Sequence, residues 1–162
     1  MNDEDLLFSG LKVLDVGSWI AAPVSATILA DFGADVIKVE IPGSGDAYRG
    51  LAIAPGTPDA EINYTWVQDA RNKRSITLNL KTEMGKTILR QLAQDCDVYV
   101  TNHPLNMRRD LGLTYDDIKT IADHLHYAGN IRDHAHWGKT PGVPSATAAA
   151  GGGHAHAGLM KI

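Results

Sequence analysis

The 162-residue sequence predicts an α/β fold of the Rossmann-like kind, an open and mostly parallel sheet with helices on both faces. Two observations support this prediction. The first hundred residues alternate between short β-rich runs and stretches with apolar residues at helical spacing. The connections between successive strands are also too long for hairpins, so we expect parallel strands joined by right-handed crossovers.

The chain opens with a strand, helix and strand. Residues 11–16 (LKVLDV) are β-rich and bounded by glycines, which predicts a buried strand. Residues 23–33 (PVSATILADFG) have a proline near the start and a glycine at the end, as helices often do. Residues 35–40 (DVIKVE) predict the second strand.

Further strands and helices follow in alternation. Residues 75–80 (SITLNL) predict a third strand, and Thr82 looks like the N-cap of a helix with apolar positions up to residue 92. Residues 97–101 predict a fourth strand, and residues 114–118 begin another helix with acidic residues in its first turn. In such sheets, ligands bind at the carboxyl ends of the strands.

Glu40 stands at one of these strand ends and is followed by a glycine-broken loop, residues 42–46 (PGSGD). In a dinucleotide-binding fold, an acid at this point holds the ribose. However, the turn after the first strand, residues 16–23 (VGSWIAAP), has one glycine and a bulky Trp-Ile pair where the pyrophosphate needs bare backbone. We therefore do not predict an NAD site, and we expect Glu40 to be a solvated carboxylate.

Composition excludes several classes of function. With 15 basic and 19 acidic residues and a pI near 5.9, the chain is not built to neutralise a nucleic acid. It has no apolar run of about 18 residues, and its first ten residues are acidic where a signal peptide is basic. The single cysteine, Cys96, cannot form an internal disulfide. We expect a cytoplasmic protein.

The chain divides into two parts. Residues 1–128 read as one Rossmann-like domain, and residues 129–162 as an irregular, low-complexity tail. Three alternating histidine pairs begin at His124, His134 and His154 and suggest zinc or copper ligands. No cysteine or carboxylate shares their spacing, so we predict no metal site.

Several blocks of the sequence, taken together, resemble a known family. In chain order, these blocks are residues 10–15, 22–23, 29–40, 43–46 and Arg49, then 72–82 with Gly85 and Leu89, then 97–98, Asn102 and 111–115. Together they are similar to the amino-terminal signature of the family III CoA-transferases. That group includes formyl-CoA transferase, the carnitine CoA-transferases and the α-methylacyl-CoA racemases. The similarity covers about residues 9–128.

The resemblance implies a binding site for coenzyme A on this domain. It places Ile20 and Ala21 at the cofactor after the first strand, Ile41 after the second, Leu78, Asn79, Leu80 and Lys81 after the third, and Asn102, His103 and Pro104 after the fourth. CoA offers phosphates to basic side chains, a flat base to apolar ones and a long amide arm to the backbone.

The basic residues of this site differ from the family pattern. Formyl-CoA transferase has arginines where this chain has Ile41 and Asp110, although the adjacent Arg108 and Arg109 could substitute for the second. A cationic rim remains, made of Arg71, Lys73, Arg74 and Lys81. The alternative is that Lys73 and Arg74 are simply solvated charges at the start of a strand.

The implied reaction moves CoA between an acyl-CoA and a free carboxylic acid, without a metal. Family transferases use an aspartate in a Gly-Asp segment as the nucleophile. The corresponding segment here, residues 149–154 (AAGGGH), has no carboxylate, and no Asp or Glu follows Asp133, so we assign no catalytic residue. The racemase branch exchanges the α-proton with a His/Asp pair, for which His134 or His136 would be proposed by position alone.

The resemblance also bears on assembly. Members of the family continue well beyond the length of this chain, and two full-length chains interlock, so we expect an incomplete family fold here and a homodimer for the full-length protein. Two other functions stay open. One is a 2-methylacyl-CoA racemase, and the other is a CoA-binding or subunit-interaction module without activity.

Overall fold

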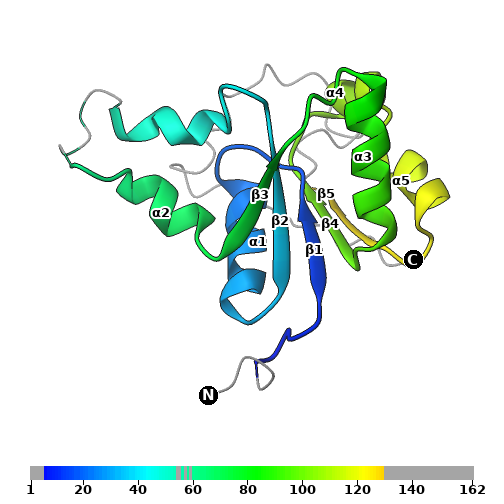
Figure 1. Cartoon of the computed structure of the whole chain (residues 1–162), viewed down its shortest axis with the longest axis horizontal. Helices are drawn as coiled ribbons and strands as arrows, with labels where there is room; N and C mark the ends of the chain where they lie inside the picture. Colours follow the sequence, from blue (N-terminus) through cyan, green and yellow to red (C-terminus); the bar gives the residue numbers. More distant parts are fainter. Residues whose placement is uncertain (1–5, 54–55, 57, 59, 130–162) are drawn as a thin grey trace, which may run out of the picture.

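The computed structural model describes residues 6–53, 56, 58 and 60–129. Its strands form one parallel sheet in the order β3-β2-β1-β4-β5, with helices on both faces (Figure 1). The strands are β1 (Lys12–Asp15), β2 (Asp35–Glu40), β3 (Lys73–Thr77), β4 (Val98–Thr101) and β5 (His126–Gly129). The predicted α/β, Rossmann-like fold is confirmed.

The connecting helices sort to the two faces of the sheet. They are α1 (Ala21–Asp31), the 3-10 helix η2 (Ala47–Ile53), α2 (Tyr64–Ala70), α3 (Glu83–Gln94), α4 (Leu105–Leu111) and α5 (Tyr115–Ile121). In Figure 1, α1 and α2 lie on one side of the strands, and α3 and α5 lie on the other. Two hydrophobic cores result, one on each face.

Strand alternation explains the two cores. Successive side chains of β1 point to opposite faces, so Val13 packs with α1 while Leu14 packs with α3 and α5. Helix α1 meets the sheet through the small buried residues Ala22, Ala26 and Ala30, which let its backbone approach closely.

Helix ends form where the sequence predicts them. The Thr82 hydroxyl accepts the amide hydrogen of Gly85, and Thr114 and Asp117 form a reciprocal capping box at the start of α5. Gly33 follows α1 with φ of 102°, a conformation that other residues adopt only with strain. The caps fix where the chain leaves each helix for the next strand.

Besides the 3-10 helix η2, which was not predicted, and shifts of one or two residues in other bounds, the structure differs from the prediction at four elements. Strand β3 covers residues 73–77 instead of 75–80, because it pairs with β2 from Val36 to Glu40 and then turns away. Helices α2 and α4 and the edge strand β5 were not predicted. All three are short, and the four residues of β5 (HYAG) have little β-propensity of their own.

The remaining predictions on organisation are tested only in part. Over the described ranges, no helix is both long enough and apolar enough to cross a bilayer. The predicted domain boundary after residue 128 falls beside the end of β5, and the predicted low-complexity tail, from residue 130 on, lies outside the described residues.

Candidate functional site

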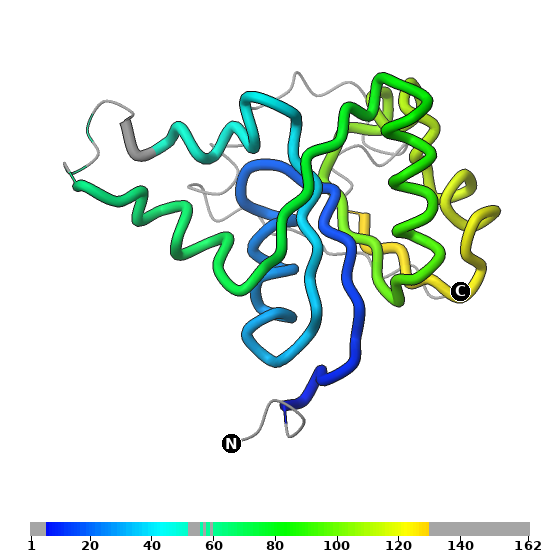
Figure 2. Tube along the Cα trace, viewed as in Figure 1, coloured from blue at the N-terminus to red at the C-terminus, as the bar shows by residue number. Residues whose placement is uncertain are grey.

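A cavity of about 860 Å³ lies at the carboxyl ends of the strands, where the strand order reverses between β1 and β4. The loops that leave β1, β2, β3 and β4 all contribute to its walls, and Figure 2 shows these turns gathered at the upper edge of the sheet. Open parallel sheets bind ligands at such a switch point. The volume suits a cofactor-sized molecule.

Most of the predicted binding residues line this cavity. They are Ile41 after β2, Leu78, Asn79, Leu80 and Lys81 after β3, and Asn102, His103 and Pro104 after β4. Ile41 is 62% exposed and presents an apolar surface at the mouth, whereas Leu78 is buried in the wall. Lys81 is exposed and adds a positive charge. The arrangement combines apolar walls with a cation, as a nucleotide carrier requires.

Two predicted residues after β1 do not line the cavity. Ile20 is the N-cap of α1 and Ala21 is its first residue. The residues after β1 that do line the cavity are 16–19, which follow the strand directly.

Lys73 and Arg74 also lie away from the cavity. The Lys73 side chain is buried, and its Nζ lies 2.9 Å from Oδ2 of Asp15 and donates a hydrogen bond to the Pro23 carbonyl. Burial lowers the pKa of Lys73, although the Asp15 carboxylate opposes this. Arg74 is exposed and pairs with Asp35 at the start of β2, far along the sheet from the strand ends. The alternative of a solvated strand-start charge therefore holds for Arg74 but not for Lys73.

Arg108 contributes the buried cation of the cavity, and the predicted Arg109 does not. Successive helical residues point about 100° apart, so α4 turns Arg108 inward and Arg109 toward solvent. Arg108 is 4% exposed, and its Nη1 donates to the Tyr127 hydroxyl at 3.2 Å. Its Nε has no hydrogen-bond partner among the described residues. No ion pair joins Arg108 to a carboxylate in the described part of the chain, and a buried guanidinium without such a partner is costly, which favours an anion at this point.

The loop after β1 has an unusual backbone that the sequence did not reveal. Trp19 has φ of 65°, a left-handed conformation that bulky residues rarely adopt, and the residue lines the cavity and is 44% exposed. Ser18 is held by the Asn102 side chain, which accepts its amide hydrogen at 2.9 Å and donates to its carbonyl at 2.7 Å. Asn102 thus shapes the wall as well as lining it.

Glu40 is neither solvated nor free to bind a ribose, which corrects the expectation from the sequence. It is 5% exposed and forms a bidentate ion pair with Arg49, with both N–O distances at 2.7 Å. The Ser75 hydroxyl and the Asp46 amide also donate to its carboxylate. Burial alone raises the pKa of Glu40, but these hydrogen bonds outweigh it and lower the pKa from 4.5 to about 2.

His103 is the imidazole of the cavity wall. Burial lowers its pKa, and the positive charges of Lys38 and Arg108 add to that effect. The ring is therefore neutral at pH 7 and has a lone pair available to accept a proton or a hydrogen bond.

No metal centre is evident in the part of the chain that the structure covers. Within those ranges, no group of three or more His, Cys, Asp and Glu side chains is arranged to hold an ion. Of the three histidine pairs, only His124 and His126 fall among the described residues, and both are exposed.

Comparisons with known proteins agree on one family. The model described as CoA-transferase family III matches residues 8–161. Succinyl-CoA:glutarate CoA-transferase of Mus musculus is 40% identical over 118 residues, which are 73% of this chain and 26% of that protein. Cinnamoyl-CoA:phenyllactate CoA-transferase of Clostridium sporogenes is 39% identical over 129 residues, 79% of this chain and 31% of that protein. The chain spans about a quarter to a third of these relatives.

Solved structures show the same fold. A CAIB/BAIF family protein from Brucella suis has a TM-score of 0.68 at 35% identity, covering 76% of this chain and 33% of that one. A hypothetical protein from Mycobacterium tuberculosis has a TM-score of 0.74 at 31% identity, covering 91% of this chain and 40% of that one.

Proposed function

Because this chain belongs to CoA-transferase family III, we propose that its cavity binds coenzyme A and that the whole protein moves CoA between an acyl-CoA and a free carboxylic acid. The observation that carries this proposal is the cavity itself, which lies where the strand order reverses and is lined by the loops in which the resemblance places the cofactor.

The chemistry of the walls supports CoA as the ligand. Ile41, Leu78 and Leu80 offer apolar surface to a flat base, and Lys81 at the rim can pair with a phosphate. Arg108 provides a second, buried cation whose Nε is without a partner among the described residues. We assign one anionic group of the ligand, a phosphate or the carboxylate of an acyl group, to Arg108.

The acids of this cavity wall do not offer a nucleophile. Glu40 is held by Arg49, and Asp46 is paired with Lys38, with both carboxylates nearly excluded from solvent. The net transfer exchanges one thioester for another and consumes neither water nor an oxidant, so it needs only a carboxylate to carry the acyl group. We therefore propose that the described residues bind and orient CoA and that the covalent step uses a carboxylate outside them.

One observation favours the racemase alternative. His103 is a neutral imidazole in the cavity wall, and a neutral imidazole can take the α-proton of an acyl-CoA. The two reactions separate in one assay, in which a 2-methylacyl-CoA in D₂O reports α-deuterium incorporation while an added carboxylate reports CoA transfer.

Binding is tested directly by isothermal titration of the folded protein with CoA, with pantetheine as the control that lacks the phosphates and the base. We expect CoA to bind at least tenfold more tightly, since the phosphates and the adenine account for most of the proposed contacts. Absence of heat with CoA would overturn the proposal. Binding without transfer or exchange would instead identify an inactive CoA-binding module.

We also propose that the full-length protein is a cytoplasmic homodimer. The resemblance implies interlocked chains. Ile28 on α1 and Phe32, the C-cap of α1, are each about half exposed, which supports contact with a second chain there. Sedimentation velocity tests the dimer, and cell fractionation tests the compartment.

A further inference from the structure

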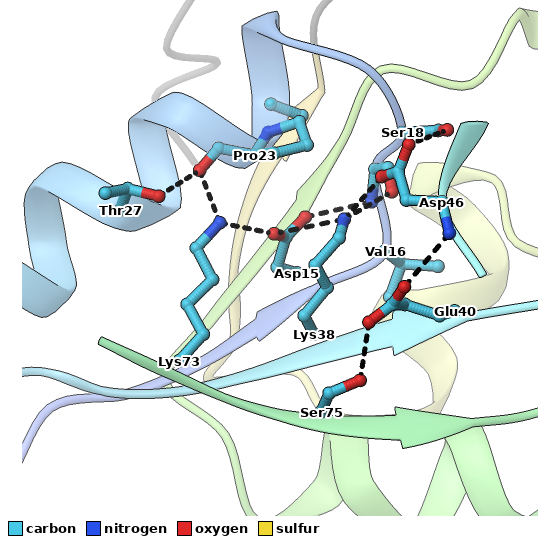
Figure 3. Close-up of polar contacts among 12 residues, drawn as sticks. Asp15, Val16, Ser18, Pro23, Thr27, Lys38, Glu40, Asp46, Lys73 and Ser75 are labelled. Carbon is cyan, nitrogen blue, oxygen red and sulfur yellow. Dashed lines mark hydrogen bonds and ion pairs between the residues drawn. The ribbon is translucent and has the colours of Figure 1, made fainter. Parts of the chain in front are cut away.

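Four charged side chains form a buried cluster, and one of them, Asp46, belongs to the cavity lining. Figure 3 shows the four side chains and their contacts. This charge cluster consists of Asp15, Lys38, Asp46 and Lys73, and each side chain is at most 2% exposed. Lys38 Nζ lies 2.8 Å from Asp46 and 3.6 Å from Asp15, and Lys73 Nζ lies 2.9 Å from Asp15. The two lysines and two aspartates balance in charge.

Stability alone does not account for the charge cluster. Removing four charges from water costs several kcal/mol per ion before pairing offsets it, and apolar side chains of similar volume often stabilise a fold as well or better. The cluster instead fixes the positions of neighbouring backbone groups.

The charge cluster holds the loop of residues 17–19, which lines the cavity. Lys38 Nζ donates to the Gly17 carbonyl, and the Gly17 amide donates to Asp15. Oδ1 of Asp46 accepts hydrogen bonds from the Ser18 hydroxyl at 2.9 Å and from the Trp19 amide at 3.0 Å. Every residue of the loop is thus bonded to a member of the cluster.

The bond to the Trp19 amide holds a strained residue. A bulky residue in the left-handed region is strained and persists only where its surroundings enforce it. Trp19, with φ of 65°, is such a residue, and it lines the cavity with 44% of its surface exposed. Asp46 in turn is fixed by Lys38 and by the Tyr48 amide.

We propose that Asp46 is a positioning residue, which keeps Trp19 in its strained conformation so that the indole forms a ready-made wall for CoA. The proposal rests on the proposed CoA site. It gives the glycine-broken loop after β2 a further role beside lining the cavity, in which Asp46 of this loop holds the neighbouring loop after β1.

Two substitutions separate the hydrogen bond from the charge. Asp46→Ala removes the acceptor, whereas Asp46→Asn keeps an oxygen at the same place, and both remove the negative charge beside Lys38. In a protein that carries Trp66→Phe and Trp137→Phe, Trp19 is the only tryptophan. Its fluorescence anisotropy and acrylamide quenching then report its mobility without ligand, and titration with CoA reports the dissociation constant.

We expect Asp46→Ala to make Trp19 more mobile and more readily quenched, and to weaken CoA binding about tenfold, the equivalent of one good hydrogen bond. Asp46→Asn should stay within about threefold of the parent on the same scale. If Asp46→Ala does not fold, the pair Lys38→Met with Asp46→Ala replaces it, because that pair leaves Asp15 matched by Lys73.

Unchanged Trp19 anisotropy in a folded Asp46→Ala protein would overturn the proposal, and so would unchanged CoA affinity. Equal losses in Ala and Asn variants would overturn it too, since the charge and not the acceptor would then matter. A parent protein that does not bind CoA refutes the proposed function instead, while the anisotropy comparison still decides whether Asp46 holds Trp19.

Discussion

The side-chain amide of Asn102 forms two hydrogen bonds with the backbone of Ser18. These bonds connect the loop after β4 to the loop after β1 at the point where the strand order reverses. Oδ1 accepts the Ser18 amide hydrogen at 2.9 Å and Nδ2 donates to the Ser18 carbonyl at 2.7 Å. The two walls of the cavity are therefore linked at one residue pair.

Replacing Asn102 should loosen both walls. We expect Asn102→Ala to lower the free energy of unfolding by about 1–2 kcal/mol, because two part-buried hydrogen bonds are lost, and to weaken CoA binding about tenfold. Urea unfolding and calorimetric titration measure the two effects. Asn106→Ala is the matched control, since Asn106 is exposed on α4 and lies outside the cavity lining. Equal CoA affinity for Asn102→Ala and wild type would contradict the prediction.

Adjacent arginines offer a second test. Arg108→Gln should weaken CoA binding by about 10–100-fold, because a charge-assisted hydrogen bond to an anion contributes about 1.5–3 kcal/mol. Arg109→Gln should change the affinity by less than about twofold, since that side chain faces solvent. Arg108→Lys keeps the charge and should recover part of the loss. If Arg109→Gln is the damaging variant, the inward-facing residue of α4 has been misassigned.

The single cysteine should be unreactive in the folded protein. Cys96 is 3% exposed, and burial together with the Asp97 carboxylate raises the pKa of its thiol to about 11. At pH 8 the thiolate fraction is then about one in a thousand. We expect no reaction with Ellman's reagent over minutes in buffer and complete reaction in guanidinium chloride. Rapid labelling of the native protein would show that the join between α3 and β4 is open.

Local patterns were enough to predict four of the five strands of the sheet and their parallel arrangement. The β-rich runs between glycines and the helical spacing of apolar residues mark one strand or helix at a time, and Thr82 and Thr114 mark helix starts by their own hydrogen bonds. Elements of four to seven residues, such as α4 and β5, carry too little pattern, because packing against the sheet decides their structure.

The site was predicted at the level of loops and not of side chains. A strand end is set by topology, and the residues predicted directly after β2, β3 and β4 line the cavity. Lys73 does not line the cavity, because its side chain pairs with the buried Asp15, which lies 58 residues earlier in the chain. The left-handed backbone conformation of Trp19 is held by a hydrogen bond to Asp46 in another loop, so the residues next to Trp19 in the sequence do not predict it.

Stability in acid tests the pairing of Glu40 with Arg49. The pKa of Glu40 is lowered from 4.5 to about 2, so its ion pair stabilises the folded protein fully above about pH 4.5 and progressively less as the pH falls toward 2. We expect this contribution to be about 2–3 kcal/mol, somewhat reduced because the Arg49 side chain is 43% exposed.

Glu40→Gln removes the titrating group. Its free energy of unfolding, measured with urea from pH 6 to pH 2.5, should therefore fall less steeply with acid than that of wild type. Glu83→Gln is the control, because that carboxylate is 81% exposed. Parallel pH profiles for wild type and Glu40→Gln would show that Glu40 titrates alike in the folded and unfolded chain, and the ion pair would then make no pH-dependent contribution.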